Sequence, residues 1–542
     1  MTGDAQTFAS KVPPDHPVAV QSGADRQEKR KEGEQRAESP SGKLFAAGYG
    51  APGQGNVDWL RIFKKEPGTK DLKSQFPDVI ITQPQSDKAN LPAMQRPDRT
   101  EKPADRPPSI RDQIQKTASL IGTMGDPLAR LQAVRPEEIK AYFRRDGNNL
   151  PPIADDFKQI ALNSLKEKEA QDLLKPQIHV STRPGNQKFP LGSRENPYTS
   201  IQTAVDKAPS GSVINVHRVG NDTYRAAVNI KRSDIVLQTD KDNPAVLDMQ
   251  EQSGDRGAIS VGSGVHNVDI KNFDIRNFSG FSSGIRVDGN SISNINIVNN
   301  NVHHAASASG VEGIAVYGRG QSEATKISNI NLLGNSVHDL ALAEKEGMPI
   351  NGNVSDFKVI GNRGYRMDNI FIDTIGYEDT SKNDAVNQAR HGLITFNYAD
   401  DISTINNPNS SCGGQYSAAA IYSDAGKDLV IRNNYVSNSD FGITLGSEHV
   451  GKFSSDSRVS GNVIDHALFK AFGLGGDPGR PGGARNSLME NNTLIGNADI
   501  ERQKNIENVE PRNNPGYKSI DTVRYLPTII AELARSYGQG QR

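Results

Sequence analysis

Residues 429–434 read Leu-Val-Ile-Arg-Asn-Asn, in which two apolar side chains at alternate positions precede a pair of asparagines. Similar copies occur at Ile295–Asn300, Ile330–Asn335, Phe357–Asn362, Ile402–Asn407, Ser457–Asn462 and Ser487–Asn492. In some of them Gly replaces the first Asn, and the last two begin with Ser. Alternating apolar residues predict short strands with one buried face. Because a side-chain amide carries both a donor and an acceptor, we expect the second Asn of each copy to hydrogen-bond its neighbours in a ladder.

A second short strand, opened by a small residue, alternates with the first. Its copies are GIRVD from Gly284, GIAVY from Gly313, GMPIN from Gly347, NIFID from Asn369, GLITF from Gly392, AIYSD from Ala420, GITLG from Gly442 and GLGGD from Gly473. Their starts lie 22 to 34 residues apart, which is the period of a solenoid rather than of globular domains. Such strands stack on their equivalents in the next coil. The sequence therefore predicts an all-β solenoid, a right-handed single-stranded parallel β-helix, over residues 177–510.

The rest of the chain differs in composition. Residues 1–108 contain 13 Pro and long polar runs, and we expect a disordered arm. Residues 109–176 carry helical periodicity and predict a small helical segment. Residues 196–208 predict a helix that caps the open end of the solenoid, and residues 511–542 predict a tail with an amphipathic helix.

Overall composition excludes several classes of protein. The 542 residues carry a net charge of -1 and one Cys, so a disulfide framework and a zinc site of several thiolates are excluded. Near-neutral charge provides no field that would attract nucleic acid. No apolar run is long enough to span a bilayer, and the first thirty residues lack the apolar core of a signal peptide. We expect secretion by a signal-peptide-independent route or, otherwise, a cytoplasmic protein.

The start of the solenoid carries a family resemblance. Residues 196–206 read Asn-Pro-Tyr-Thr-Ser-Ile-Gln-Thr-Ala-Val-Asp, and a turn at Asn221–Arg225 follows. This segment resembles the pectin-lyase-like superfamily of right-handed parallel β-helix proteins, and the resemblance covers about residues 177 to 500. It implies the fold. It does not specify the chemistry, because the superfamily includes lyases, hydrolases, epimerases and non-catalytic surface proteins.

Aligning the second strand pattern places one residue per coil at the same position. The aligned residues are Asp288, Tyr317, Asn351, Asp373, Phe396, Asp424, Gly446 and Asp477. Asp373 and Asp424 would lie two coils apart, about 10 Å at the backbone for coils spaced by ~4.8 Å. That separation is compatible with a pair of catalytic carboxylates in a glycoside hydrolase of the inverting type.

The middle coils depart most from the repeat, and function is expected at such departures. They add Glu378, Arg390, His391 and Glu448 to the two aspartates. Segments around Asp373 with Glu378, Arg390, Asp424 and Glu448 are similar to segments of other β-helix repeat proteins. We predict Asp373, Asp424, Arg390, Glu378 and Glu448 as catalytic residues, in a groove along the central coils that binds a polysaccharide, which we expect to be acidic.

Three kinds of chemistry remain open at this site. Paired carboxylates suit a glycoside hydrolase. A polysaccharide lyase would need a base and a cation, and clustered acids, with Asp373, Asp424 and Glu448 as candidates, could hold calcium through oxygen. The third possibility is an adhesin, tail-spike-like protein or exported effector that binds glycan without chemistry. Tyr317, Tyr416, Tyr422 and His391 are the predicted substrate-binding residues.

Three histidines follow the asparagine positions of their coils. His303, His304 and His338 lie at predicted turns, where a histidine is more often a hydrogen-bonded surface group than a metal ligand.

Overall fold

The computed structural model describes residues 149–517, apart from residues 251, 253–255, 280–281, 308, 408, 410–412 and 477–481. Three predicted segments lie outside the described residues: the arm (1–108), the part of the helical segment that precedes residue 149, and the C-terminal helix.

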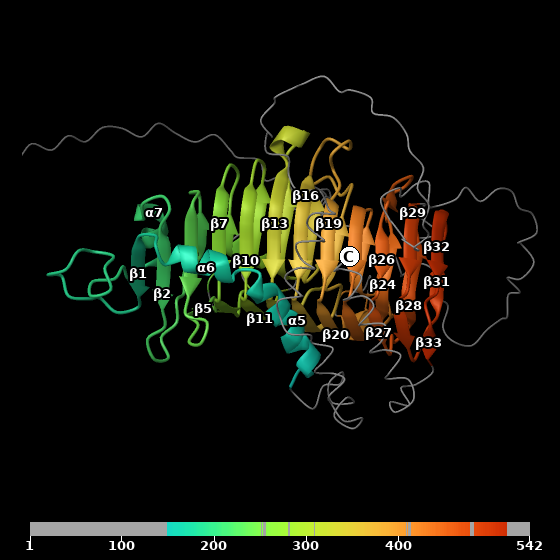
Figure 1. Ribbon diagram of the computed structural model, residues 1–542, viewed down its shortest axis with the longest axis horizontal. Helices are drawn as coiled ribbons and strands as arrows, with labels where there is room; N and C mark the ends of the chain where they lie inside the picture. The colour runs from blue at the N-terminus through green and yellow to red at the C-terminus, as the bar shows by residue number, and fades with distance from the viewer. Residues whose placement is uncertain are drawn as a thin grey trace, which may run out of the picture.

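The described chain winds into an elongated solenoid walled by three parallel sheets, here called A, B and C (Figure 1). Sheet A contains β1 (Gln177–Ser181), β2 (Val213–His217), β4 (Ile235–Thr239), β7 (His266–Lys271), β10 (Ser293–Val298), β13 (Ile327–Leu333), β16 (Val354–Ile360), β19 (Arg390–Thr395), β22 (Lys427–Arg432), β25 (Phe453–Ser455), β26 (Arg458–Ser460), β29 (Gly483–Glu490) and β32 (Ile506–Arg512).

Sheet B contains β5 (Val246–Asp248), β8 (Asp274–Arg276), β11 (Asn301–Ala306), β14 (Ser336–Ala341), β17 (Arg363–Met367), β20 (Tyr398–Ile402), β23 (Tyr435–Ser439), β27 (Val463–Asp465), β30 (Thr493–Ile495) and β33 (Gly516–Tyr517). Sheet C contains β3 (Val228–Ile230), β6 (Gly257–Val261), β9 (Ser283–Gly289), β12 (Glu312–Gly318), β15 (Met348–Gly352), β18 (Ile372–Ile375), β21 (Ala419–Asp424), β24 (Phe441–Gly446), β28 (Lys470–Gly475) and β31 (Ile500–Arg502). From β4 to β31 each coil contributes one strand to each wall, with β25 and β26 sharing one coil in sheet A, so the predicted parallel β-helix is confirmed.

The predicted asparagine ladder is present at the corner between sheets A and B. The amide of Asn300 donates to the side-chain oxygen of Asn335 at 3.1 Å, and the same bond repeats through consecutive coils. The further members are Asn362, Asn397, Asn434, Asn462, Asn492 and Asn514. The prediction of Asn407 as a member is wrong, because Asn397 occupies its place and Asn407 instead donates to two backbone carbonyls.

The residue before each ladder Asn explains the Asn-or-Gly preference of the pattern. Its backbone is left-handed, with φ of 54° at Asn299, 64° at Gly334 and 55° at Asn433, a region that Gly and Asn enter at low cost. Phe396 takes this position before Asn397 with φ of 56°. Because Phe does not match the Asn-or-Gly pattern, the sequence alignment places residues 392–396 with the second strand pattern instead of the first.

The glycines near the start of β9 and β12, Gly284 and Gly313, face the interior of the solenoid. A Cβ atom on Gly313 would lie 2.4 Å from Cγ1 of Val337, and one on Gly284 would lie 2.4 Å from Cγ1 of Val302. Both distances are far shorter than a van der Waals contact, so these two positions require glycine. Ile, Val, Leu and Phe side chains from all three sheets fill the continuous core behind them.

Three described α-helices pack against the solenoid. α7 (Ile201–Lys207) is capped by Ser200, whose hydroxyl accepts from the backbone N–H of Thr203, and it contacts β1, β2 and β3 at the first coil. α5 (Pro152–Asn163) buries Phe157 and Ile160 against the central coils, and α6 (Lys166–Asp172) follows it. Two 3-10 turns, η4 (Glu323–Thr325) and η5 (Thr404–Asn406), lie in loops. No helix in the described part of the chain is long and apolar enough to cross a membrane.

Candidate functional site

Carboxyl groups gather on the outer face of sheet C, across the strands from β12 to β24. Asp373 lies within β18 and Asp424 ends β21, and each side chain is 1% exposed. The residues that carry this feature, here called the acidic cluster, are Glu312, Glu346, Asp373, Glu378, Asp424 and Glu448. The structure thus brings together four of the five predicted catalytic residues.

The register of the strands corrects the predicted spacing. Asp373 pairs with Tyr422, and β18 neighbours β21 directly. Asp373 and Asp424 therefore lie in adjacent coils rather than two coils apart. They are a diagonal pair, which places their Cα atoms about 8 Å apart for strands ~4.8 Å apart that rise ~3.3 Å per residue. The misassignment arose at Phe396, which lies at the corner between sheets A and B and not in the aligned row, while Asp477 lies outside the described residues.

Burial and mutual repulsion keep protons on this face. Burial raises the pKa of Asp373 well above its usual range, and the charges of Glu346, Asp424, Glu378 and Glu448 raise it further. Burial also raises the pKa of Glu378 and of Asp424. Like-charged carboxyls in a site of low polarity cannot all ionise together, so the face presents both protonated and ionised acids.

Specific contacts distinguish the members of the acidic cluster. Oδ1 of Asp424 accepts the backbone N–H of Glu448 at 3.0 Å, which favours its charged form. Oε2 of Glu378 accepts from the amide of Asn351 at 2.8 Å. Among the described residues, Oδ1 of Asp373 and Oε1 of Glu378 are buried without a hydrogen-bond partner. Such oxygens are costly in a purely structural role.

Glu312 and Glu346 were missed by the sequence reading. Glu312 accepts from Arg286 at 2.9 Å and from the hydroxyl of Tyr317 at 2.6 Å. Both glutamates directly precede the glycine that opens their strand, at Gly313 and Gly347. The recurrence of a buried acid at this position was the available signal.

The predicted tyrosines play different parts. Tyr317 lies on the same face, under the guanidinium of Arg286 at 4.3 Å. Tyr422 is 1% exposed and packs against Ile370 and Phe441. Burial, with Asp424 nearby, raises the pKa of Tyr422 well above its usual value. Tyr416 lies elsewhere, beside a groove along sheet B.

Arg390 and His391 lie in sheet A, away from the acidic cluster. Arg390 binds Glu323 at 2.7 Å and Asn353 at 3.0 Å, and it also donates to carbonyls of the loop before β19. His391 is held by the hydroxyl of Ser355 at 2.9 Å and has a left-handed backbone with φ of 54°. Their contacts in the structure hold loops and coils together.

A metal could approach one edge of the acidic cluster. Carboxylate oxygens of Glu378 and Asp424 and a ring nitrogen of His449 lie within 4.8 Å of one another. This trio differs from the predicted one of Asp373, Asp424 and Glu448. Calcium takes six to eight oxygen ligands, and two carboxyl groups and an imidazole do not supply that number. This trio therefore does not support calcium, which stays a prediction to be tested by chelation.

These features define a parallel β-helix protein with an acid-rich outer face on its third sheet. The chain is 31% identical over 320 residues to the uncharacterized protein YwoF of Bacillus subtilis (strain 168), a match that covers 56% of this chain and 66% of YwoF. The chain thus spans somewhat less than two thirds of that relative. No protein-family model matches the chain.

Solved structures with this architecture are distant in sequence. An alginate lyase from Paenibacillus sp. str. FPU-7 is 14% identical, with a TM-score of 0.41 over 57% of this chain and 96% of that one. A GH136 lacto-N-biosidase from Eubacterium ramulus is 10% identical, with a TM-score of 0.40 over 67% and 69% of the chains. PfbA, a surface adhesin of Streptococcus pneumoniae, is 13% identical, with a TM-score of 0.37 over 67% and 92%. The likeness extends to the fold alone, so the activity must be argued from the site.

Proposed function

We propose that the protein is a glycoside hydrolase that cleaves a polysaccharide on the outer face of sheet C. The observation that carries the proposal is the pairing of Asp373 with Asp424 inside the acidic cluster. Asp373 keeps its proton through burial and four acidic neighbours. Burial raises the pKa of Asp424 as well, but Asp424 also accepts the backbone N–H of Glu448, which favours its ionised form, so we assign the carboxylate role to Asp424.

The two carboxyl groups supply the two roles that glycoside hydrolysis needs. Asp373 is the general acid that protonates the leaving oxygen, as a carboxyl with a raised pKa can at neutral pH. Asp424 is the carboxylate that stabilises the oxocarbenium-like transition state. It either activates a water molecule, as in inverting enzymes, or attacks the anomeric carbon, as in retaining enzymes. Glu378 and Glu448 lie beside them and orient the sugar hydroxyls.

The charge of the face bears on the substrate. A uronate would bring a further negative charge to buried acids that already repel one another. The proposal therefore favours a neutral sugar at the cleavage point. The acidic polysaccharide expected from the sequence would require a bound cation, and cleavage that depends on added calcium and stops on chelation would support that form.

The test is an activity assay with isosteric variants. Purified protein is incubated with neutral and acidic polysaccharides while reducing ends and the ultraviolet absorbance of unsaturated products are followed. New reducing ends without absorbance would support hydrolysis, and rising absorbance would show a lyase. We expect Asp373→Asn and Asp424→Asn to lower kcat by at least about 100-fold, the usual range for acid–base catalysis.

The control is another buried aspartate of the same solenoid. Asp400 is 3% exposed in β20 of sheet B, where it accepts from Ser437 at 2.8 Å. Asp400→Asn should retain activity. Full activity of the double variant Asp373→Asn/Asp424→Asn would refute the proposed site.

A further inference from the structure

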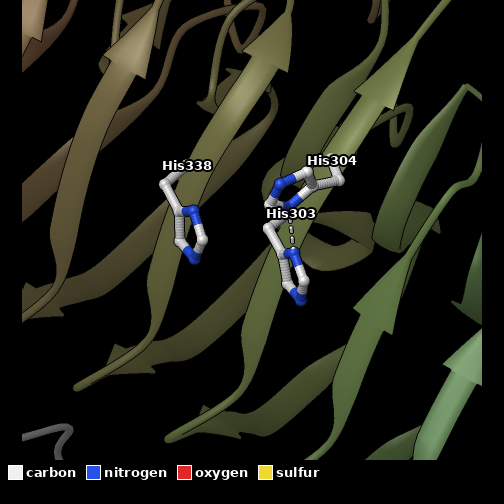
Figure 2. Close-up of side chains that lie close together, drawn as sticks. All are labelled: His303, His304 and His338. Atoms are coloured by element: carbon white, nitrogen blue, oxygen red, sulfur yellow. Dashed lines mark hydrogen bonds between the residues drawn. The ribbon is translucent and has the colours of Figure 1, made fainter. Parts of the chain in front are cut away.

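Three histidines converge on the outer face of sheet B, on a different wall from the acidic cluster. His303 and His304 are adjacent in β11, and His338 lies in β14 directly opposite His303. One ring nitrogen of each lies within 4.8 Å of the other two. Figure 2 shows His304 turned toward His303 above the parallel rings of His303 and His338.

Neighbouring acceptors determine which ring nitrogens carry hydrogen. The amide nitrogen of Asn301 donates to Asp274 at 3.1 Å, so the amide oxygen of Asn301 accepts from Nε2 of His338 at 2.9 Å. Nε2 of His303 lies 3.2 Å from both carboxylate oxygens of Asp274, which can only accept. In their neutral forms, His303 and His338 therefore carry hydrogen on Nε2 and a lone pair on Nδ1.

The two lone pairs meet other electron-rich atoms. Nδ1 of His303 lies 2.5 Å from Nδ1 of His304, and Nδ1 of His338 lies 2.5 Å from Oδ2 of Asp339. Metal-ligating histidines characteristically donate their other ring N–H to a carboxylate or amide oxygen, as both rings do.

Ring stacking alone does not explain the cluster. His303, His338 and Tyr365 form a parallel stack with centroids 4.9 Å and 4.4 Å apart, which accounts for two of the histidines. His304 stands at 82° to both other imidazoles and lies closer to His303. Its backbone is left-handed, with φ of 53°, as are the equivalent positions Asn277, Asp339 and Arg366 in neighbouring coils, so the repeat itself turns His304 toward His303.

We propose that His303, His304 and His338 bind a divalent transition-metal ion of the zinc class. Imidazole nitrogens suit zinc and its neighbours, whereas calcium and magnesium prefer oxygen. Zinc–nitrogen bonds of 2.0–2.1 Å place ligand atoms of a tetrahedron about 3.3 Å apart, and the three ring nitrogens here lie within 4.8 Å of one another. Asp274 and Asn301 hold the rings in the ligating tautomer.

The cluster borders a groove on the side of His304. His304 and Asp339 line a groove of about 690 Å³ that also contains Arg366, Asp401 and Tyr416. Three protein ligands with one open position are the arrangement of zinc sites that bind water or a ligand. The site is independent of the proposed glycoside hydrolase activity on sheet C.

The experiment is a calorimetric titration of the purified full chain with Zn²⁺, with Co²⁺ absorbance as a spectroscopic probe of nitrogen ligation. The variant is His303→Phe/His304→Asn, in which Phe preserves the ring stack and Asn tolerates the left-handed backbone. The matched control is His466→Asn, because His466 follows β27 with φ of 56° beside an acidic neighbour but without other histidines nearby.

We expect one Zn²⁺ per chain, binding at least about 100-fold weaker in the double variant and unchanged binding in the control. Thermal unfolding confirms that each variant folds, and His338→Gln provides a second variant with an intact β11. Equal Zn²⁺ affinity in wild type and in these variants, or Ca²⁺ binding as tight as Zn²⁺, would overturn the proposal.

Discussion

Asp373, Glu378 and Asp424 face a conflict at the level of single residues, because each is buried beside like charges. A folded-state pKa above the unfolded value means that the folded protein binds the proton more tightly than the unfolded chain does. The stability from that proton is fully present below the unfolded pKa of about 4 and is lost as pH rises through the folded pKa. The acidic face is therefore maintained at the expense of stability at neutral pH, as functional sites often are.

We accordingly expect Asp373→Asn to become more stable relative to wild type as pH rises from about 4 to about 8, by about 1.4 kcal/mol for each unit of pKa shift removed. Urea unfolding at several pH values measures the difference. Asp172→Asn is the control with opposite sign. Burial alone would raise the pKa of Asp172, but hydrogen bonds from Lys175 and Lys271 hold it low, so that variant should lose stability at neutral pH and recover at low pH. A pH-independent effect of Asp373→Asn would contradict the assignment of the proton.

At the level of the strand, the interior glycine of β12 allows a direct test of packing. A Cβ on Gly313 would lie 2.4 Å from Val337 and 2.6 Å from the backbone oxygen of Gly347. We expect Gly313→Ala to lower the free energy of unfolding by about 1–3 kcal/mol through overpacking. Gly262→Ala is the control, because a Cβ there meets nothing within 4 Å. Equal unfolding midpoints for the two variants in urea would show that the interior beside Gly313 is not tightly packed.

The same elements show what the sequence could predict. Asn300, Asn335 and Asn362 mark the corner because only an amide can both donate and accept along the axis, so the fold and most of the register were predictable. Phe396 breaks that pattern, and its left-handed backbone is supported by packing against Phe157 at 5.5 Å. That contact joins segments far apart in the sequence, so periodicity could not reveal that Asp373 and Asp424 occupy adjacent coils.

At the scale of the whole molecule, the solenoid is more than a stack of coils that contact only their neighbours. α5 lies across the corner between sheets A and B and packs on successive coils through one apolar cluster. The coil residues in that cluster are Val298, Leu333, Ile360, Leu393, Phe396, Tyr398, Tyr435, Val463 and Ile495. In a solenoid stabilised mainly by nearest-neighbour contacts, a helix that spans several coils couples their unfolding.

Phe157→Ala tests this coupling. Phe157 is 2% exposed and meets Phe396 edge to face, so its truncation should lower stability by about 3–5 kcal/mol. The effect should appear as earlier unfolding of the central coils, because the loss of α5 removes their shared support. Hydrogen exchange at the amides of β13, β16 and β19, measured together with urea unfolding, reports it directly. Gln159→Ala, on the exposed face of the same helix, should leave both unchanged. If Phe157→Ala accelerated exchange only within α5, the helix would be an appendage and the coils would stand without it.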